Sequence, residues 1–418
     1  MKIGITYGHI SSNIGDIAIN RGLAGLLSSV VPDSHVHVVL HNPNERFMES
    51  GKDSFLGIRN LTFGRTPGPT DLDLASEFVR RPRAFLEETG IADCDVILYN
   101  SGEHLFSYAE GSPRPDMIWR MLPALAAKAA GIPFISLPMT IGPFEGQVYE
   151  RLMREYLQLH DEFAFRESES SRIASSLTKG TEILTMLDPA FFSPVPRNVL
   201  DDNGRTLGIV MRLEGYGLRV GPQKSRAVLA RYARRGFEGS TAFQFAFGAA
   251  KQFLEAASDS EVVLYIQGVA YDFELTLAVA QALASAGYRG RVRVVQPTSV
   301  EDYQRQLGLA SMLVASRFHA CILGLLSGRP VMGVYFEEHG HKMPGLFDFL
   351  GLPDYCDSIS VPAMSSVPKP EVRGTSSRIE AGDLRPICEL LAQDPQLLDS
   401  RGSPHIVPLQ PRCEHPAD

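Results

Sequence analysis

The chain has 418 residues, of which 44% are hydrophobic and 21% are charged, a composition typical of a globular protein and not of a disordered one. This length exceeds what one ordinary hydrophobic core serves, so it predicts two domains. Charged residues of both signs are mixed along the sequence and the formal net charge is −8. We therefore expect no basic stripe of the kind that binds DNA or RNA, and no nucleic acid partner.

The cysteines and the apolar runs indicate the compartment. The five cysteines are odd in number and include no Cys-x-x-Cys pair, so neither a disulfide framework nor a cysteine zinc site is predicted, and a reducing cytoplasm fits best. The chain begins directly with a strand pattern, without the apolar core of a signal peptide. No apolar run approaches the ~20 residues that a membrane span needs. We expect a cytoplasmic protein whose membrane contact is at most peripheral.

Short runs rich in Val and Ile recur between longer helical patterns, which is typical of parallel sheets covered by helices on both faces. A first series of strands is predicted at residues 2–6, 36–40, 96–99, 134–137, 162–166 and 183–186. A second series is predicted at residues 206–211, 262–266, 292–295, 312–315 and 331–335. The fold class is therefore α/β.

The region from 189 to 204 is rich in Pro and Asp and reads as a connector between the two series. It predicts two Rossmann-like domains, at residues 1–195 and 204–400, which face a central cleft with the ligand between them. Residues 51–82 are rich in Gly, Pro, Asp and Arg and are interpreted as a long insertion of open role. We expect the Pro-rich tail at 401–418 to be flexible.

The first loop opens a helix that is predicted to continue through Leu27. Asn13, Gly15 and Asp16 stand at its start. A glycine there permits close backbone approach to a ligand, and an acidic side chain is favoured by the helix dipole and could hold a sugar hydroxyl. A simple Asp cap beside a turn glycine explains the same residues equally well.

Polar residues also follow later strands of the first series, where ligands of open α/β sheets bind. Gly102, Glu103 and His104 form a small-residue turn that bears a carboxylate and an imidazole. Further along, Arg166–Glu167 reads most simply as a local ion pair beside a Ser168 helix cap, and Asp188–Pro189 as a turn initiator.

In the second series, Ser316, Arg317 and His319 stand at the mouth of an apolar helix, directly after a predicted strand. A helix N-terminus offers unpaired N–H groups and a partial positive charge, so a guanidinium and an imidazole there suit a phosphate or carboxylate. Ser316 is expected to be the N-cap. Taken alone, the motif also fits a solvated arginine and a satisfied core histidine.

The order and spacing of these segments resemble the polysaccharide pyruvyl transferase family, over residues 1 to about 352. The most specific part is the Arg-Phe-His-Ala block with its downstream Lys342-x-x-Gly-Leu. The segments that carry the resemblance are Gly15-Asp16, Ser101-Gly102, Ile141-Gly142-Pro143-Phe144, Arg166-Glu167-Ser168-Glu169-Ser170, Asp188-Pro189-Ala190-Phe191, Ser316-Arg317-Phe318-His319-Ala320, Gly328-Arg329-Pro330-Val331 and Lys342.

The resemblance implies a fold similar to the B-type glycosyltransferases and transfer of pyruvate from phosphoenolpyruvate to sugar hydroxyls, usually as a cyclic ketal. The first domain then takes the carbohydrate acceptor and the second takes the donor. The expected catalytic residues are Arg317 and His319, where His319 acts as general acid or base or binds the donor phosphate. The expected donor-binding residues are Ser316, Arg317, His319, Lys342 and Arg212, and the expected acceptor-binding residues are Asn13, Asp16, Gly102, Glu103, His104 and Arg166.

No cofactor and no metal are expected. His339 and His341 lie two apart in a glycine-bearing loop with two carboxylates, but no third ligand spacing is recognisable. Where the family has three glycines near residue 100, this chain has Asn-Ser-Gly, which puts the acceptor or donor choice in doubt. Gln267 and Asp272 also stand where the family places polar groups, and Asp272 is interpreted as a helix N-cap. A nucleotide-sugar glycosyltransferase and a non-catalytic sugar-binding relative remain the alternatives.

Overall fold

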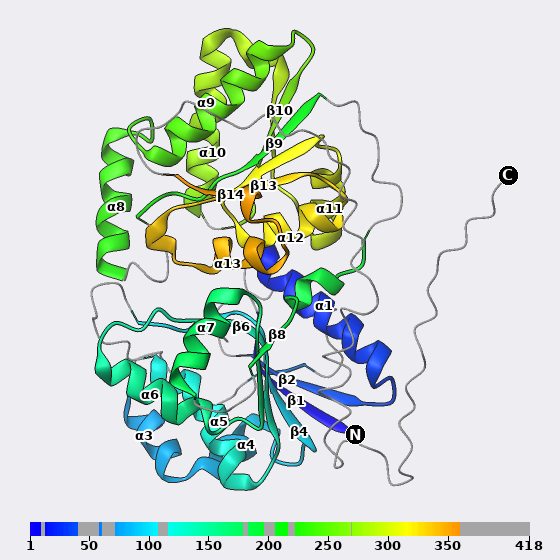
Figure 1. The fold of residues 1–418 in the computed structure, drawn as a ribbon, viewed down its shortest axis with the longest axis vertical. Coiled ribbons are helices and arrows are strands. Elements are labelled where there is room, and N and C mark those ends of the chain that lie inside the picture. Colours follow the sequence, from blue (N-terminus) through cyan, green and yellow to red (C-terminus); the bar gives the residue numbers. More distant parts are fainter. Residues whose placement is uncertain are drawn as a thin grey trace, which may run out of the picture.

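The computed structural model describes residues 1–9, 13–40, 58–60, 72–107, 116–178, 183–195, 205–215, 222–268 and 270–359. The predicted flexible tail and residues 360–400 of the predicted second domain lie outside this part of the chain. Figure 1 shows two lobes, each built on one sheet, with helix α1 (Ile14–Val30) at their junction. Within the described residues, no helix is both long enough and apolar enough to cross a membrane.

The first sheet is parallel throughout, in the order β3-β2-β1-β4-β6-β7-β8, with β5 beside β6. Its strands are β1 (Lys2–Gly8), β2 (His35–Leu40), β3 (Ile58–Asn60), β4 (Val96–Tyr99), β5 (Glu103–Leu105), β6 (Phe134–Ile141), β7 (Glu162–Phe165) and β8 (Leu184–Thr185). The connecting helices are α1, α3 (Leu72–Arg80), α4 (Pro82–Thr89), α5 (Met117–Ala130), α6 (Gln147–Leu157), α7 (Ser168–Leu177) and the 3₁₀ turn η1 (Pro189–Phe192).

The second sheet is also parallel, in the order β11-β10-β9-β12-β13-β14. Its strands are β9 (Thr206–Val210), β10 (Glu261–Tyr265), β11 (Val292–Val295), β12 (Met312–Ala315), β13 (Val331–Tyr335) and β14 (Cys356–Ser358). Its helices and short turns are α8 (Pro222–Arg235), α9 (Thr241–Ala256), α10 (Ala270–Leu283), η3 (Ala284–Tyr288), η4 (Arg289–Arg291), α11 (Val300–Gly308), α12 (Phe318–Leu326), η5 (Glu337–His339), α13 (Lys342–Phe349) and η6 (Pro353–Tyr355).

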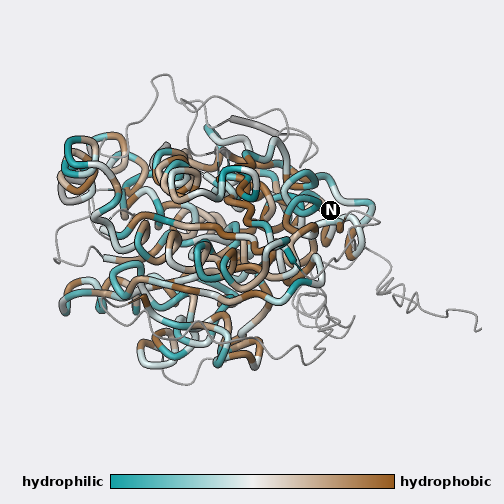
Figure 2. Tube along the Cα trace, turned by 90° about the horizontal axis from the view of Figure 1, so that it is seen from above, coloured by the Kyte–Doolittle hydropathy of each residue, from teal (hydrophilic) through white to brown (hydrophobic). Residues whose placement is uncertain are grey.

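Both sheets have the same internal order, which confirms the predicted α/β class with two Rossmann-like units. In each sheet the first strand lies beside the fourth main strand, β1 beside β4 and β9 beside β12, so the direction of winding reverses there. The central strands β4 and β6 are buried along their whole length, as expected for strands covered on both faces. Figure 2 shows apolar segments crossing the interior of the molecule. Ligands of such sheets bind at the carboxyl ends of the strands beside the reversal.

The structure contains three short strands that the sequence did not predict. β5 lies where residues 102–104 were interpreted as a turn, and it pairs with β6. β3 and α3 lie within residues 51–82, so part of the predicted insertion belongs to the sheet edge and its covering helices. β14 adds the last edge of the second sheet. Each strand is three residues long, too short to show an alternating pattern.

Helix α1 and the turn η1 fasten the two domains together. Ile14, Ile17 and Phe191 belong to the same hydrophobic cluster as Phe318 and Ile322 of α12. Gly22 lies so close to η1 that an added Cβ would be 1.6 Å from the Pro189 carbonyl oxygen. The domains therefore share buried apolar surface, and α1 approaches η1 at backbone contact distance.

We predict that Gly22→Ala destabilises the protein, because the new methyl group meets backbone that cannot rotate away. Gly25→Ala on the same helix is the matched control, since its Cβ would lie 3.5 Å from the nearest atom, the Phe192 carbonyl oxygen. Alanine gains about 0.5–1 kcal/mol over glycine in a helix, so the control should be neutral or more stable. Urea unfolding measures the free energy of unfolding of both variants. Equal midpoints for the two variants would contradict this packing.

Candidate active site

The carboxyl ends of β9 and β12 are joined by one serine. Ser316 donates its N–H to the Val210 carbonyl oxygen at 2.8 Å, and its Oγ accepts the Arg212 N–H at 2.7 Å. The prediction that Ser316 caps α12 is wrong: Arg317 is the N-cap residue, with no side-chain cap bond, and the serine hydroxyl serves the neighbouring strand. This arrangement holds Arg212 and Arg317 at adjacent strand ends.

Arg317 forms a buried ion pair with Asp272. Asp272 is 1% exposed and lies inside the first turn of α10, so its interpretation as a helix N-cap is wrong. Burial raises the pKa of Asp272, while Arg317 and Arg212 act in the opposite direction. Arg317 Nε is also buried, without a hydrogen-bond partner in the described part of the chain. The guanidinium therefore keeps a donor that no described protein group uses.

Lys342 adds a third cation, at the first residue of α13. Its Nζ lies 2.5 Å from Glu103 Oε2 of the first domain. Burial lowers the pKa of Lys342 to about 8; Glu103 opposes the shift, and Arg212 adds to it. His339 lies near the same cations. Its pKa is held well below the ordinary value by burial and by the positive charges of Arg212, Lys342 and Arg317. The positive charges of Arg212, Arg317 and Lys342 thus act together on the neutral imidazole of His339.

His319 faces the buried carboxylate of Asp188, which sequence analysis assigned to a turn and not to the site. His319 Nε2 is 3.8 Å from Asp188 Oδ2. The same carboxylate accepts from Arg166 at 2.7 Å, from the Ala190 N–H at 2.7 Å and from Ser101 Oγ at 3.4 Å. Burial alone would raise the pKa of Asp188, but His319, Arg166 and the Ala190 N–H hold it far below its usual range. Asp188 is thus an ionised group beside the imidazole, whose Nε2 is buried without a hydrogen-bond partner among the described residues.

Two interpretations of this region need correction. Arg166 does not pair with Glu167: it is 2% exposed and bonds Asp188 and Thr140 Oγ1, the latter at 2.9 Å. Glu167 caps α7 itself by accepting the Ser170 N–H at 2.9 Å, so Ser168 is not the cap. Asp188 does cap the η1 turn, but it also joins the site. The Asp-Pro-Ala-Phe segment was the available signal for it.

The start of α1 lies against the imidazole of His319. Asn13 is the N-cap and accepts from Gly15 N at 3.2 Å and from Gln267 Nε2 at 3.1 Å, so Asp16 is not the cap. A Cβ on Gly15 would lie 2.4 Å from His319 Nδ1. Glycine is needed here because the histidine ring packs directly on the backbone. Asp16 is half-buried in the first turn of the helix.

The carboxyl ends of β1 and β4 bring together aromatic and basic groups. His104 stacks on His9, with ring centroids 5.8 Å apart, and its Nδ1 lies 3.1 Å from Arg120 NH1. Burial lowers the pKa of both histidines. Glu103 reaches across to the second domain, whereas His104 is 6% exposed. Gly102 lies against the His104 ring, since a Cβ there would be 2.5 Å from Nε2. Arg120 was missed because it lies inside the helical pattern of α5.

Other features lie outside this site. The part of the chain that the structure describes has no group of three His, Cys, Asp or Glu side chains that could hold a metal. In the loop at 337–342, Glu338 accepts the Gly215 N–H and His341 approaches Glu167 at 3.6 Å.

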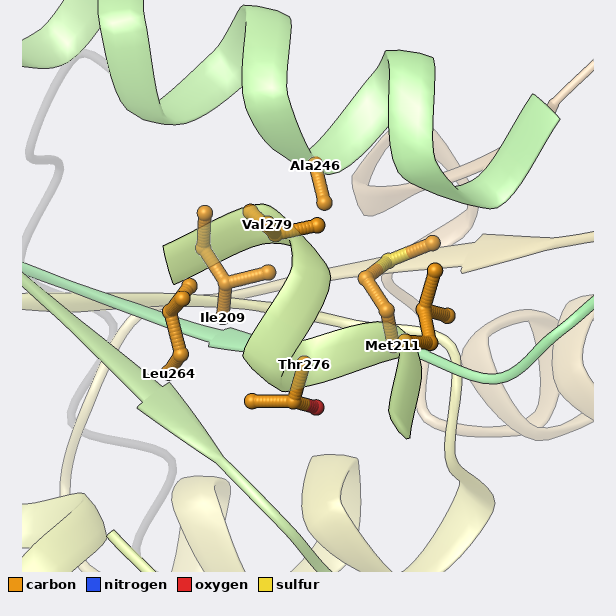
Figure 3. A pocket seen from close by; sticks show the side chains of 7 residues that line it. Ile209, Met211, Ala246, Leu264, Thr276 and Val279 are labelled. Carbon is orange, nitrogen blue, oxygen red and sulfur yellow. The ribbon is translucent and has the colours of Figure 1, made fainter. Parts of the chain in front are cut away.

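Figure 3 shows an apolar cavity between the second sheet and helices α9 and α10, lined by Ile209, Met211, Ala246, Leu264, Leu275, Thr276 and Val279. It has room for about one water, so it is a packing defect.

We predict that Arg166→Gln lowers the free energy of unfolding by about 3–5 kcal/mol, because it leaves the Asp188 charge buried without its guanidinium. The double variant Arg166→Gln, Asp188→Asn should recover part of this loss, since the uncompensated charge is gone. Chemical unfolding at pH 7 measures these two variants and the single variant Asp188→Asn. Additive losses in the double variant would show that the two side chains do not interact.

Comparison with known proteins agrees with this architecture. The structure of Anabaena HepE in complex with UDP is 12% identical, with a TM-score of 0.51 over 97% of this chain and 93% of HepE. A UDP-N-acetylglucosamine 2-epimerase is also 12% identical, with a TM-score of 0.50 over 95% of this chain and 88% of the epimerase. At such low identity the likeness shows the fold alone, which is the two-domain plan of the B-type glycosyltransferases.

At the level of sequence, no functionally curated protein matches the chain. The model of one family, polysaccharide pyruvyl transferase, matches residues 13–337. This span begins at the Asn13 cap and includes the segments of Arg166, Asp188, Arg317 and His319, while Lys342 follows it. The match covers well over half of the chain, and the chain therefore belongs to the polysaccharide pyruvyl transferase family, as a transferase.

Proposed function

We propose that this transferase moves pyruvate from phosphoenolpyruvate to hydroxyls of a sugar in a glycan or glycoconjugate, forming a cyclic ketal and releasing phosphate. The observation that carries the proposal is the convergence of Arg212, Arg317 and Lys342 around His339, with Arg317 two residues before His319 at the start of α12. Phosphoenolpyruvate bears a carboxylate and a phosphate, and guanidinium groups bind both by paired hydrogen bonds. The Nε of Arg317 is buried and has no hydrogen-bond partner among the described residues.

The proposed reaction balances without a cofactor. A proton adds to the methylene carbon of the enol, C2 gains oxocarbenium character, and a sugar hydroxyl attacks C2. The C2–O bond to phosphate breaks, and a second hydroxyl closes the ketal. One hydroxyl proton replaces the proton given to carbon, and the other leaves with phosphate. We assign the proton transfers to His319, whose Nε2 lies 3.8 Å from Asp188 Oδ2.

The acceptor is proposed to bind on the first-domain side of His319. Asp16 and Glu103 are the carboxylates there that could take hydrogen bonds from sugar hydroxyls, beside Asn13 and Gly102. Arg166 and His104 were assigned to the acceptor from the sequence, yet both are nearly fully buried and hydrogen-bonded to protein groups. We therefore assign Arg166 to positioning Asp188, and His104 to supporting strand β5, which carries Glu103.

The first test is a thermal-shift titration with phosphoenolpyruvate, set beside UDP, GDP and UDP-sugars. A ligand at about 100 times its dissociation constant adds about 2.7 kcal/mol to the folded state, which raises the melting temperature clearly. We expect stabilisation by phosphoenolpyruvate that is lost in Arg317→Ala and reduced in Arg212→Ala. Arg289→Ala, an exposed arginine of the same domain, is the charge-matched control and should respond like the wild type.

Stabilisation by a nucleotide alone would reject the proposed donor and favour the glycosyltransferase alternative. A response to phosphoenolpyruvate that persists in Arg317→Ala would reject the assigned site. Melting temperatures without ligand show whether each variant remains folded, which matters because removing Arg317 leaves Asp272 without its buried partner.

A pH series tests Lys342 separately. Because the pKa of Lys342 is lowered to about 8, the free site loses this cation as the pH rises through that value. We predict that the affinity for phosphoenolpyruvate falls between about pH 7 and pH 9 in the wild type. Lys342→Arg keeps its charge throughout and should show a flat profile over this range. Calorimetric titration measures both. The same slope in wild type and variant would remove Lys342 from the donor site.

A further inference from the structure

One segment departs from the even mixing of charges along the chain. Between residues 215 and 237 the sequence contains six Lys or Arg and no Asp or Glu, although the whole protein has a net charge of −8. Helix α8 occupies 222–235 within this segment. This helix is therefore a local exception to the even mixing of charges along the chain.

The four arginines of α8 are exposed to solvent. Its apolar side is fixed, since Tyr232 is buried and Val228 and Leu229 pack against the core of the second domain. Four arginines on the remaining face are exposed, namely Arg226, Arg231, Arg234 and Arg235. No ion pair joins any of them to a described acidic group. On other helices, by contrast, exposed arginines have acidic partners, as in Arg151–Glu155, Arg172–Glu169 and Arg305–Asp302.

Contacts to the donor side of the site hold α8 in place. Tyr232 Oη donates to Glu214 Oε1 at 2.7 Å, and Glu214 also accepts the Thr241 N–H at 2.7 Å. Gly215 lies against Val228, where a Cβ would be 3.0 Å away. Glu214 follows Arg212 by two residues. Figure 1 shows α8 on the outer flank of the second domain. The arginine face is thus rigidly attached to the loop that carries Arg212.

We infer that the arginine face of α8 docks this protein on a membrane surface that bears anionic phospholipids. Guanidinium groups match phosphate geometry, and several basic side chains on one face gain attraction from the negative potential of such a surface. The exposed side of α8 carries alanines and no large apolar residue, so the contact is electrostatic and does not insert. Nucleic acid fits less well because the only aromatic residue of α8, Tyr232, is buried and gives bases no stacking surface.

Docking by α8 has a consequence for substrate access. A membrane held at this flank lies close to the loop of Arg212, so an acceptor carried on a lipid reaches the site from the bilayer surface. The docking itself is independent of which donor the site binds. Its success or failure in experiment is therefore separate from that of the phosphoenolpyruvate titration.

The test is co-sedimentation of the full chain with vesicles of phosphatidylcholine containing about 30% phosphatidylglycerol, against vesicles of phosphatidylcholine alone. We expect binding to the anionic vesicles only, falling steeply between about 0.1 M and about 0.5 M salt. The variant R226Q/R231Q/R234Q/R235Q should bind roughly tenfold or more weakly. The control R80Q/R81Q/R151Q/R154Q makes the same change of charge on exposed arginines of the first domain and should bind like the wild type.

Several results would overturn the inference. These are no binding of the wild type to anionic vesicles, binding that salt does not weaken, or equal weakening in both quadruple variants. A nucleic acid that binds through the four α8 arginines, when vesicles do not, would assign the face to a different partner. Circular dichroism melting curves establish that both quadruple variants are folded, and the salt series on the wild type decides the matter without any variant.

Discussion

The site depends on one buried carboxylate. Asp188 has 0% exposure and follows the last strand of the first sheet, where it must find enough partners to remain charged. Arg166 at the end of β7 supplies the countercharge, η1 supplies a backbone N–H, and His319 of α12 approaches from the second domain. A single ionised group thereby fixes three segments from two domains.

On the donor side, positive charges are clustered, whereas Asp188 is a buried negative charge. Arg212, Arg317 and Lys342 repel one another, and their separation is held by backbone, since Ser316 ties the ends of β9 and β12 together. Asp272 and Glu103 offset part of the repulsion from two sides, one from within the domain and one from across the interface. Burial is the main cause of the lowered pKa of Lys342, and the positive charge of Arg212 lowers it further. Because the three cations repel one another, a ligand with more than one negative charge is expected to bind such a site most favourably.

Sequence patterns predicted what is local or repeated. The central strands were found to within a few residues, because burial on both faces gives them continuous apolar runs, and the helix-mouth position of Arg317 and His319 follows from the same periodicity. Asp188 was missed because an Asp-Pro pair has the same local pattern whether the turn is exposed or buried. Ser316 was misjudged because its partner, Arg212, lies 104 residues away in the sequence. The spacing of residues along the sequence does not reveal which side chains are buried or which hydrogen bonds join distant residues.

The shared cluster of α1, η1 and α12 has a consequence for how such a protein can be divided. If the chain were cut between its two sheets, each half would expose the apolar surface that Ile17, Phe191 and Phe318 now cover for one another. Each fragment would then expose an apolar patch, which promotes aggregation. The two Rossmann-like units are therefore interdependent parts of one folded body, and exchanging one of them for that of a relative requires α1 and η1 to move with their partner helix.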